Sequence, residues 1–198
     1  MTRTLCWLLL AAAVAAGCSG GAIEASGTIR DEVRPVSSFD RIVVRRGVDV
    51  QIVADPDAAA SVIVHYDDNV IGEIVTEVNR NTLEIRLEAE VRLRGGGRRF
   101  VEVTVPRLNR IEATDGARIV GLGQVAALQV LASGGASVDL GSLEASAIDV
   151  DVSGGANTTV NATGIVQGDA SGGARLLVVG RPSVVNVATS GGASVADG

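Results

Sequence analysis

A short glycine-rich element recurs through the second half of the chain and restricts the fold more than any other sequence feature. Its lead residues are spaced 19, 20, 18 and 19 positions apart, and each stands three residues before an alanine. These lead residues are Thr114, Ser133, Ser153, Ser171 and Ser190. A period near 20 residues is typical of a solenoid, in which each repeat forms one coil that stacks on the next. The paired glycines suit repeated corners, because glycine adopts positive φ without steric cost.

Apolar and polar residues alternate on the approach to each corner. Before the third corner, Ile148, Val150 and Val152 alternate with Asp149 and Asp151. A period of two predicts a strand with one face turned inward. A second alternating run follows each corner, so each repeat supplies two strands. We therefore predict an all-β fold, a right-handed parallel β-helix with coils of about 19 residues.

The region before the repeats is also strand-rich, but its apolar runs do not recur. Turn signals separate these runs at Asp55-Pro56-Asp57, Asn79-Arg80-Asn81 and Gly95-Gly96-Gly97. An exposed solenoid end needs a cap, and this region could supply either the cap or the first irregular coils. We predict one domain over 37–198, with irregular strands or a cap over 37–106 and regular coils over 107–198.

The first residues of the chain are typical of an export signal. Arg3 precedes an apolar run of 12 residues, which is too short to span a membrane. Gly17 and Cys18 follow in a cluster of small residues that resembles the lipobox of bacterial lipoproteins. We predict a lipoprotein signal peptide over 1–17 and a lipidated N-terminus with a short tether over 18–36. The alternative is an ordinary signal peptide followed by an unrelated cysteine.

The number of cysteines favours a lipid anchor at Cys18. The other cysteine, Cys6, lies inside the predicted signal peptide, so the mature chain has no second cysteine for an internal disulfide. Several acyl chains on one cysteine anchor a protein stably. Ser19, rather than aspartate, follows the cysteine, which resembles the default signal for the outer membrane. We therefore expect an exported protein, lipid-anchored to the cell envelope, at the outer membrane if the source is Gram-negative.

Several strand motifs together with the serial SGGA elements resemble the putative auto-transporter adhesin head GIN domain family. The matching residues outside the repeat are Phe39, Ile42, Val48-Asp49-Val50, Leu83-Glu84-Ile85, Val103-Thr104-Val105-Pro106, Leu108 and Ile111. The resemblance covers roughly residues 37 to 194. It implies a β-helical domain on exported, often lipid-modified bacterial proteins. It implies no established catalytic residues.

Two outward carboxylates are the strongest catalytic candidates in the repeats. Asp151 and Asp169 occupy equivalent positions of successive coils, which would place them about 5 Å apart. That separation is compatible with a retaining glycosidase pair or a cation site. The alternative is a solvated acidic face, because outward positions are expected to be charged. No aromatic sugar platform accompanies the pair.

The chain contains one concentration of basic residues, which flanks a triple glycine. It consists of Arg92, Arg94, Arg98 and Arg99. On a hairpin tip these side chains could contact anionic lipid headgroups, lipopolysaccharide or acidic glycans. The alternative is a solvated loop that keeps a strand edge soluble. Since His65 is the sole histidine, a histidine-based triad is excluded, and we interpret the lead serines as corner residues whose hydroxyls bond to the turn.

These observations favour a non-enzymatic protein that presents a β-helix as a binding or structural surface, in adhesion or envelope maintenance. Without the signal peptide the chain has 16 arginines against 23 acidic residues, a net charge of −7. Nucleic-acid binding, which depends on neutralising phosphates, is therefore not expected. We expect no cofactor, and the partners are the membrane, through Cys18, and an envelope protein or glycan. The alternative is a polysaccharide-active enzyme that uses Asp151 and Asp169.

The last coil also suggests an assembly hypothesis. No sequence pattern of a cap follows the element at Ser190. An uncovered coil exposes strand edges that can pair with another chain. We therefore expect that this coil can mediate self-association.

Overall fold

The computed structural model describes residues 23–88, 90–92 and 98–198. The predicted signal peptide over 1–17, Cys18 and Arg94 lie outside these residues. In the described chain, 14 strands form one mixed sheet and two more form a small separate sheet. Within these ranges no helix is long and apolar enough to cross a membrane, and the helical part is a 3-10 turn, η1 (Ile71–Glu73). The prediction of an all-β fold is confirmed.

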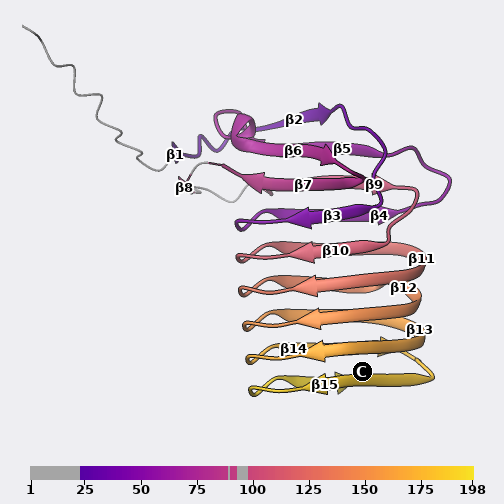
Figure 1. Ribbon diagram of the computed structural model, residues 1–198. Coiled ribbons are helices and arrows are strands. Elements are labelled where there is room, and N and C mark those ends of the chain that lie inside the picture. Colours follow the sequence, from indigo (N-terminus) through magenta and orange to yellow (C-terminus); the bar gives the residue numbers. More distant parts are fainter. Residues whose placement is uncertain (1–22, 89, 93–97) are drawn as a thin grey trace, which may run out of the picture.

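The large sheet wraps around an apolar core and presents two faces (Figure 1). From the N-terminal end of the stack, the first face consists of β2 (Ile29–Arg34), β5 (Ser61–Asp67), β9 (Phe100–Val105), β4 (Asp49–Ala54), the first halves of β11 (Arg118–Ala132), β12 (Ser137–Val152) and β13 (Asn157–Ala170), β14 (Arg175–Gly180) and β16 (Ser194–Asp197). The second face consists of β6 (Ile74–Asn79), β7 (Thr82–Leu87), β3 (Arg41–Val44), β10 (Arg110–Ala113), the second halves of β11 to β13, and β15 (Val184–Thr189).

Neighbouring coils pair in parallel, so that equivalent residues of successive repeats lie side by side. On the second face Val130 pairs with Val150, Val150 with Gly168, and Gly168 with Val187. Val130 and Val150 are buried, whereas Asp149, between two inward positions, is exposed. The inward and outward alternation predicted for these strands is therefore confirmed.

The glycine-rich elements form the corners of the coils on one side of the stack (Figure 1). At the second corner, Gly134 and Gly135 have φ angles of 60° and 76°. Two successive positive φ angles define a type I′ turn. A Cβ atom on Gly134 would lie 3.0 Å from the backbone nitrogen of Asp115 in the neighbouring corner. Both the backbone conformation and the close stacking of corners therefore favour glycine.

The lead serines close these turns through their backbone carbonyls. In each serine-led corner the carbonyl of the lead residue accepts a hydrogen bond from the N–H of the alanine three positions later, at 3.1 or 3.2 Å. Between residues that the structure describes, the predicted hydrogen bonds from the serine hydroxyls to the turn are not found. The Thr114 hydroxyl instead contacts the side chain of Asp115 at 3.2 Å. The hydrogen bond between the backbone carbonyl of the lead serine and the N–H of the alanine already closes the turn.

Two further coils lie on the N-terminal side of the regular repeats in the stack. Their strands do not follow the sequence spacing of the repeats. β3 pairs with β10 and β4 pairs with β11, so β3 and β4 form a coil with its corner at 45–48. Arg46 and Gly47 in this corner also have positive φ angles. β7 and β9 form the next coil of the stack. The sequence analysis left open whether this region forms the first irregular coils or a cap, and β3, β4, β7 and β9 form such coils.

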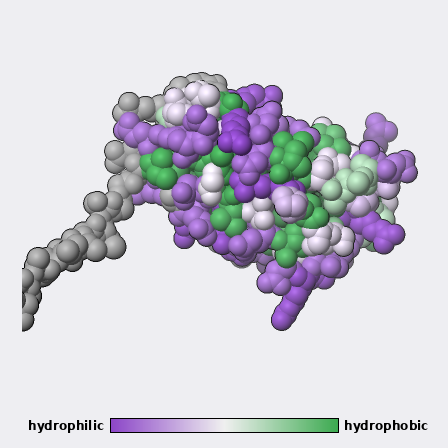
Figure 2. Space-filling view, turned by 90° about the horizontal axis from the view of Figure 1, so that it is seen from above, coloured by the Kyte–Doolittle hydropathy of each residue, from purple (hydrophilic) through white to green (hydrophobic). Residues whose placement is uncertain are grey.

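Antiparallel strands close the N-terminal end of the stack. β5 pairs with β9, β2 with β5, and β6 with β7, all antiparallel. The core residues under these strands, among them Val62, Val64 and Ile74, are at most 1% exposed. Figure 2 looks onto this end and shows a mainly hydrophilic surface with smaller apolar patches. We call this end of the molecule the antiparallel cap.

Part of the segment that was expected to be a tether is folded. β1 (Ile23–Glu24) pairs in parallel with β8 (Val91–Arg92), and β2 also lies within 18–36. The expectation of a tether extending to residue 36 is therefore wrong for these two strands. The reason is compositional, since β2 is mostly charged and exposed and has too few apolar residues to show a strand period.

Candidate functional site

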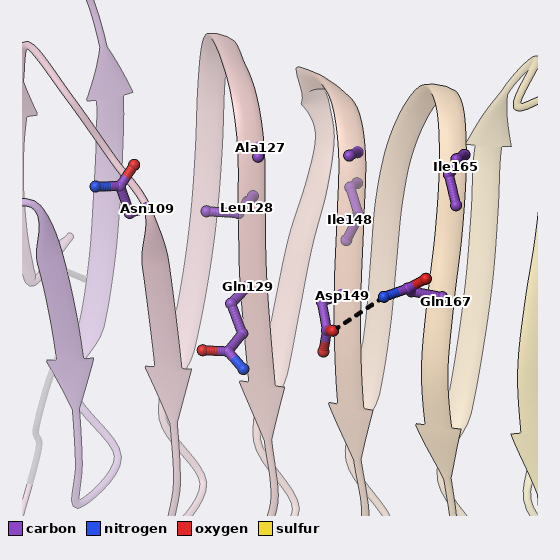
Figure 3. A pocket seen from close by; sticks show the side chains of 9 residues that line it. Asn109, Ala127, Leu128, Gln129, Ile148, Asp149, Ile165 and Gln167 are labelled. Carbon is purple, nitrogen blue, oxygen red and sulfur yellow. Dashed lines mark hydrogen bonds between the residues drawn. The ribbon is translucent and has the colours of Figure 1, made fainter.

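A groove on the second face is the first candidate site. It has a volume of about 390 Å³ and crosses the ends of three coils (Figure 3). We call it the carboxamide groove. Its lining residues are Asn109, Ala127, Leu128, Gln129, Ala147, Ile148, Asp149, Ile165 and Gln167.

The strand register arranges this lining into two columns. Gln129, Asp149 and Gln167 stand side by side on successive strands, and the residues two positions earlier form an apolar column that includes Ile165, which is 44% exposed. The Gln167 amide donates to the Asp149 carboxylate at 3.4 Å (Figure 3). Arg110 donates to the Gln129 oxygen at 3.0 Å. The groove thus offers donors and acceptors beside an apolar strip, repeated at the strand spacing of about 4.8 Å.

The two candidate carboxylates of the sequence analysis do not line this groove. Asp151 and Asp169 are direct register partners on β12 and β13, and both are exposed. The structure therefore brings them together as the repeat predicted. Asp151 also lines a smaller hollow of about 310 Å³ with Thr114, Ser133 and Ser153. No histidine is present there, and within the described residues no group of three histidine, cysteine or acidic side chains could hold a metal ion.

The four arginines of the basic segment do not form one exposed patch. Arg92 lies on β8, Arg98 is exposed, and Arg94 is outside the described residues. The Arg99 side chain is only 6% exposed and pairs with the carboxylate of Asp67, which is fully buried. The expectation that Arg99 is a surface residue is therefore wrong. Its buried partner lies 32 positions away, so the sequence gave no indication of the pair.

Asp67 joins three parts of the antiparallel cap. Its carboxylate accepts hydrogen bonds from both Nε and Nη2 of Arg99 and from the Gly27 N–H at 2.6 Å. The hydrogen bonds from Arg99 hold the pKa of Asp67 below its ordinary value of 3.8. Burial raises the pKa of the neighbouring Tyr66 to about 12. Asp67 is therefore a charged structural link between the start of the folded chain and β9.

A second groove lies on the first face beside this link. It has a volume of about 430 Å³, and we call it the arginine groove. Its lining residues are Asp49, Val50, Gln51, Arg98, Arg99, Phe100, Arg118 and Val120. The guanidinium of Arg98 lies 5.3 Å from the centre of the Phe100 ring. The same ring stacks on the His65 ring, with the two ring centres 4.5 Å apart.

Arg118 is a member of this groove that the sequence analysis did not single out. It follows the first corner at an outward position and pairs in register with Asp49 of β4. Desolvation by burial raises the pKa of Asp49, and the charge of Arg118 opposes this shift. Arg98 and Arg118 form no ion pair with any residue that the structure describes. Only the folded coil brings them to one groove, because they belong to different levels of the stack.

Comparisons with known proteins agree with the architecture. The profile of the family described as "Putative auto-transporter adhesin, head GIN domain" matches residues 38–127 and 116–182. A solved putative adhesin from Bacteroides fragilis NCTC 9343 is 18% identical, with a TM-score of 0.55 over 88% of this chain and 99% of its own. At this identity the likeness shows the fold alone.

More remote solved structures are also similar. A putative adhesin from Parabacteroides merdae ATCC 43184 is 10% identical, with a TM-score of 0.46 over 89% of this chain and 98% of its own. A putative lipid binding protein from Parabacteroides distasonis ATCC 8503 is 14% identical, with a TM-score of 0.42 over 90% of this chain and 100% of its own. No curated protein matches the chain.

Proposed function

Because the chain belongs to the putative auto-transporter adhesin head GIN domain family, we propose that it is a lipid-anchored cell-envelope protein with a non-catalytic binding surface. The carboxamide groove is the binding site in this proposal, and an envelope glycan is its ligand. The role is adhesion or envelope maintenance. The coils are taken to wind right-handed, the usual hand of parallel crossovers, which a crystal structure of the soluble form would test.

The arrangement of the carboxamide groove is the observation that supports binding. Its carboxamides and carboxylate can donate to and accept from sugar hydroxyls, while the apolar column fits the apolar face of a sugar ring. Recognition sites of this kind combine an apolar lining with a few placed polar groups. A chain of sugar units running along the stack would meet the same pair of columns on each coil. Binding therefore needs no moving part and no reactive side chain.

The anchor determines where such binding would take place. Ile23, the first described residue, comes five positions after Cys18. Even a fully extended stretch of that length reaches only about 18 Å. With Cys18 acylated, the domain would therefore work close to its membrane, which favours an envelope glycan over a distant receptor.

The test is a glycan and envelope-protein binding array with the mature chain carrying Cys18→Ser, which removes the lipid. We expect retention of a defined glycan class. The double variant Gln129→Ala/Gln167→Ala should bind that class at least about tenfold more weakly, since two hydrogen-bonding groups are lost. Gln124→Ala is the matched control, because its amide bonds to Glu144 outside the groove at 2.8 Å. An array without hits, or equal losses in both variants, would contradict the proposal.

A second candidate function rests on the pairing of Asp151 with Asp169. Two carboxylates on adjacent strands have the separation that retaining glycosidases use. In that case the protein would cleave a polysaccharide. The decisive experiment is incubation of cell-wall and capsular glycans with the wild type and with Asp151→Asn. Turnover that disappears in the variant would establish the enzyme and displace the binding proposal.

A further inference from the structure

Two described parts of the chain between β7 and β9 lie beside the N-terminal part of the described chain. In β8, Val91 pairs with Ile23 of β1. Directly before β9, Arg99 shares the carboxylate of Asp67 with the Gly27 N–H. The arginine groove is therefore built on the same cluster that fastens the N-terminal segment. Any lipid on Cys18 would be held near it.

The arginine groove has the chemistry of an anion site. Arg98 and Arg118 have exposed guanidinium groups without an ion pair among the described residues. Guanidinium groups recognise phosphate with two parallel hydrogen bonds. The groove volume of about 430 Å³ lies within the usual range for small-ligand sites. Gln51 adds an amide donor, so a phosphate would meet several donors at once.

The neighbouring residues hold the groove in shape. The Phe100 ring carries the Arg98 guanidinium on one side and stacks on His65. His65 in turn contacts the Asp31 carboxylate at 2.7 Å. The adjacent Arg99 is fixed by its buried partner Asp67. The Phe100 ring therefore restrains the exposed Arg98 side chain, which lowers the entropy lost when a ligand binds.

We propose that the arginine groove binds the phosphate of an anionic lipid headgroup in the membrane that holds the anchor, and so orients the domain toward that membrane. The orientation part rests on the anchoring at Cys18 proposed above, but headgroup binding itself does not. Asp49 is the one acidic side chain lining the groove among the described residues. The charge of Arg118, its register partner, opposes the rise that burial causes in the pKa of Asp49.

The test uses the mature Cys18→Ser chain and co-sedimentation with phosphatidylcholine vesicles that contain or lack phosphatidylglycerol. We expect binding only to vesicles with the anionic lipid, weakening as salt is raised. The double variant Arg98→Gln/Arg118→Gln should lose roughly thirtyfold in affinity, at the usual contribution of an arginine near a charged bilayer. The matched control is Arg175→Gln/Arg181→Gln, which changes charge equally at exposed positions on lower coils. The control should lose less than about twofold.

Three results would overturn the proposal. Equal losses in both double variants would show attraction by overall charge. Binding to vesicles of phosphatidylcholine alone would show that the net negative charge of the headgroup is not required. Capture of a soluble acidic polysaccharide that depends on Arg98 and Arg118, without vesicle binding, would make a glycan the ligand. Acylation of Cys18, measured by mass spectrometry of the intact chain, separately tests the anchor, so failure of one is distinguishable from failure of the other.

Discussion

The two ends of the stack share the same alternation of apolar and polar residues but differ in how deeply the inward residues are buried. At the N-terminal end, inward residues such as Val62 and Val64 are fully buried beneath the antiparallel cap. At the other end, the coil of β15 and β16 has a neighbouring coil on one side only among the described residues, and its inward Val185 is 38% exposed. Alternation of apolar residues therefore sets which way a side chain points. Burial, and hence stability, depends on what covers the coil.

The antiparallel cap also differs from the coils in what holds it together. The coils rely on apolar ladders and backbone bonds, whereas the cap adds a buried ion pair and side-chain bonds to the N-terminal segment. The Ser26 hydroxyl, for example, donates to the Asp68 carboxylate at 2.6 Å and accepts from the Thr28 N–H at 3.1 Å, and the Ser26 N–H donates to the Asn69 side-chain oxygen at 3.0 Å. Breaking the cap should therefore cost more than trimming the last coil.

The largest effect is expected at the ion pair of the cap. Asp67→Ala removes the buried carboxylate that accepts two hydrogen bonds from Arg99 and one from the Gly27 N–H, which should lower the free energy of unfolding by about 3–5 kcal/mol. Asp31→Ala removes the partner of His65 from an exposed position and should cost less than about 1 kcal/mol. Urea unfolding of the Cys18→Ser form measures both. Equal costs would show that the buried pair does not hold the cap.

The same pair should make stability depend on pH at the acidic end. The pKa of Asp67 is lowered from 3.8 in the folded chain, so its contribution is present above that value and is lost as pH falls through the folded pKa. The variant Asp67→Asn has no titratable side chain at this position. The stability advantage of the wild type over this variant should therefore shrink below pH 3.8, as followed by thermal melting. A constant difference down to the lowest pH would contradict this role.

A matched pair of core substitutions compares the middle of the stack with its open end. Val150 and Val187 occupy the same inward column, but Val150 is 1% exposed and Val187 lies in the last coil. Val150→Ala should cost about 2 kcal/mol, because two methyl groups leave a closed core. Val187→Ala should cost less than about 1 kcal/mol. Similar losses in urea unfolding would show that the last coil is as well covered as the others.

The smallest effect is expected in assembly. Two copies related by a two-fold axis could pair the free edges of β15 and β16, since both edges lie at the same end. We expect the Cys18→Ser form to show weak self-association in light scattering at high micromolar concentration. Val185→Asp should abolish it by placing a charge in the contact. A monodisperse monomer at that concentration would rule out this contact.

The regular coils could be predicted because their corners need glycine. Positive φ angles at Gly134 and Gly135 leave a signature that recurs with the coil length. The coil of β3 and β4 has only one glycine in its corner, and Arg46 takes the other positive φ. The sequence of this corner therefore does not match the paired-glycine element of the repeats. Between β7 and β9, none of the residues that the structure describes has a positive φ angle.

The candidate sites were predicted less well than the fold. Asp151 and Asp169 were found because the repeat places them in register. Gln129 and Gln167 occupy the same outward position as Asp149 on neighbouring coils, but nothing in the sequence indicates that these side chains line a groove. Arg118 joins Arg98 only when the first regular coil stacks below β4 and β9. The proximity of these two arginines depends on how the non-repeating segment between β4 and β10 folds back onto the stack. The repeat pattern of the sequence does not indicate this.

The most direct test is calorimetric titration of the Cys18→Ser form with the glycan that the array selects, followed by mass analysis of the recovered ligand. We predict saturable binding that Gln129→Ala/Gln167→Ala weakens at least about tenfold, with the glycan recovered intact. Unchanged affinity in that variant would contradict the assignment of the carboxamide groove. A cleaved glycan would contradict a non-catalytic binding surface.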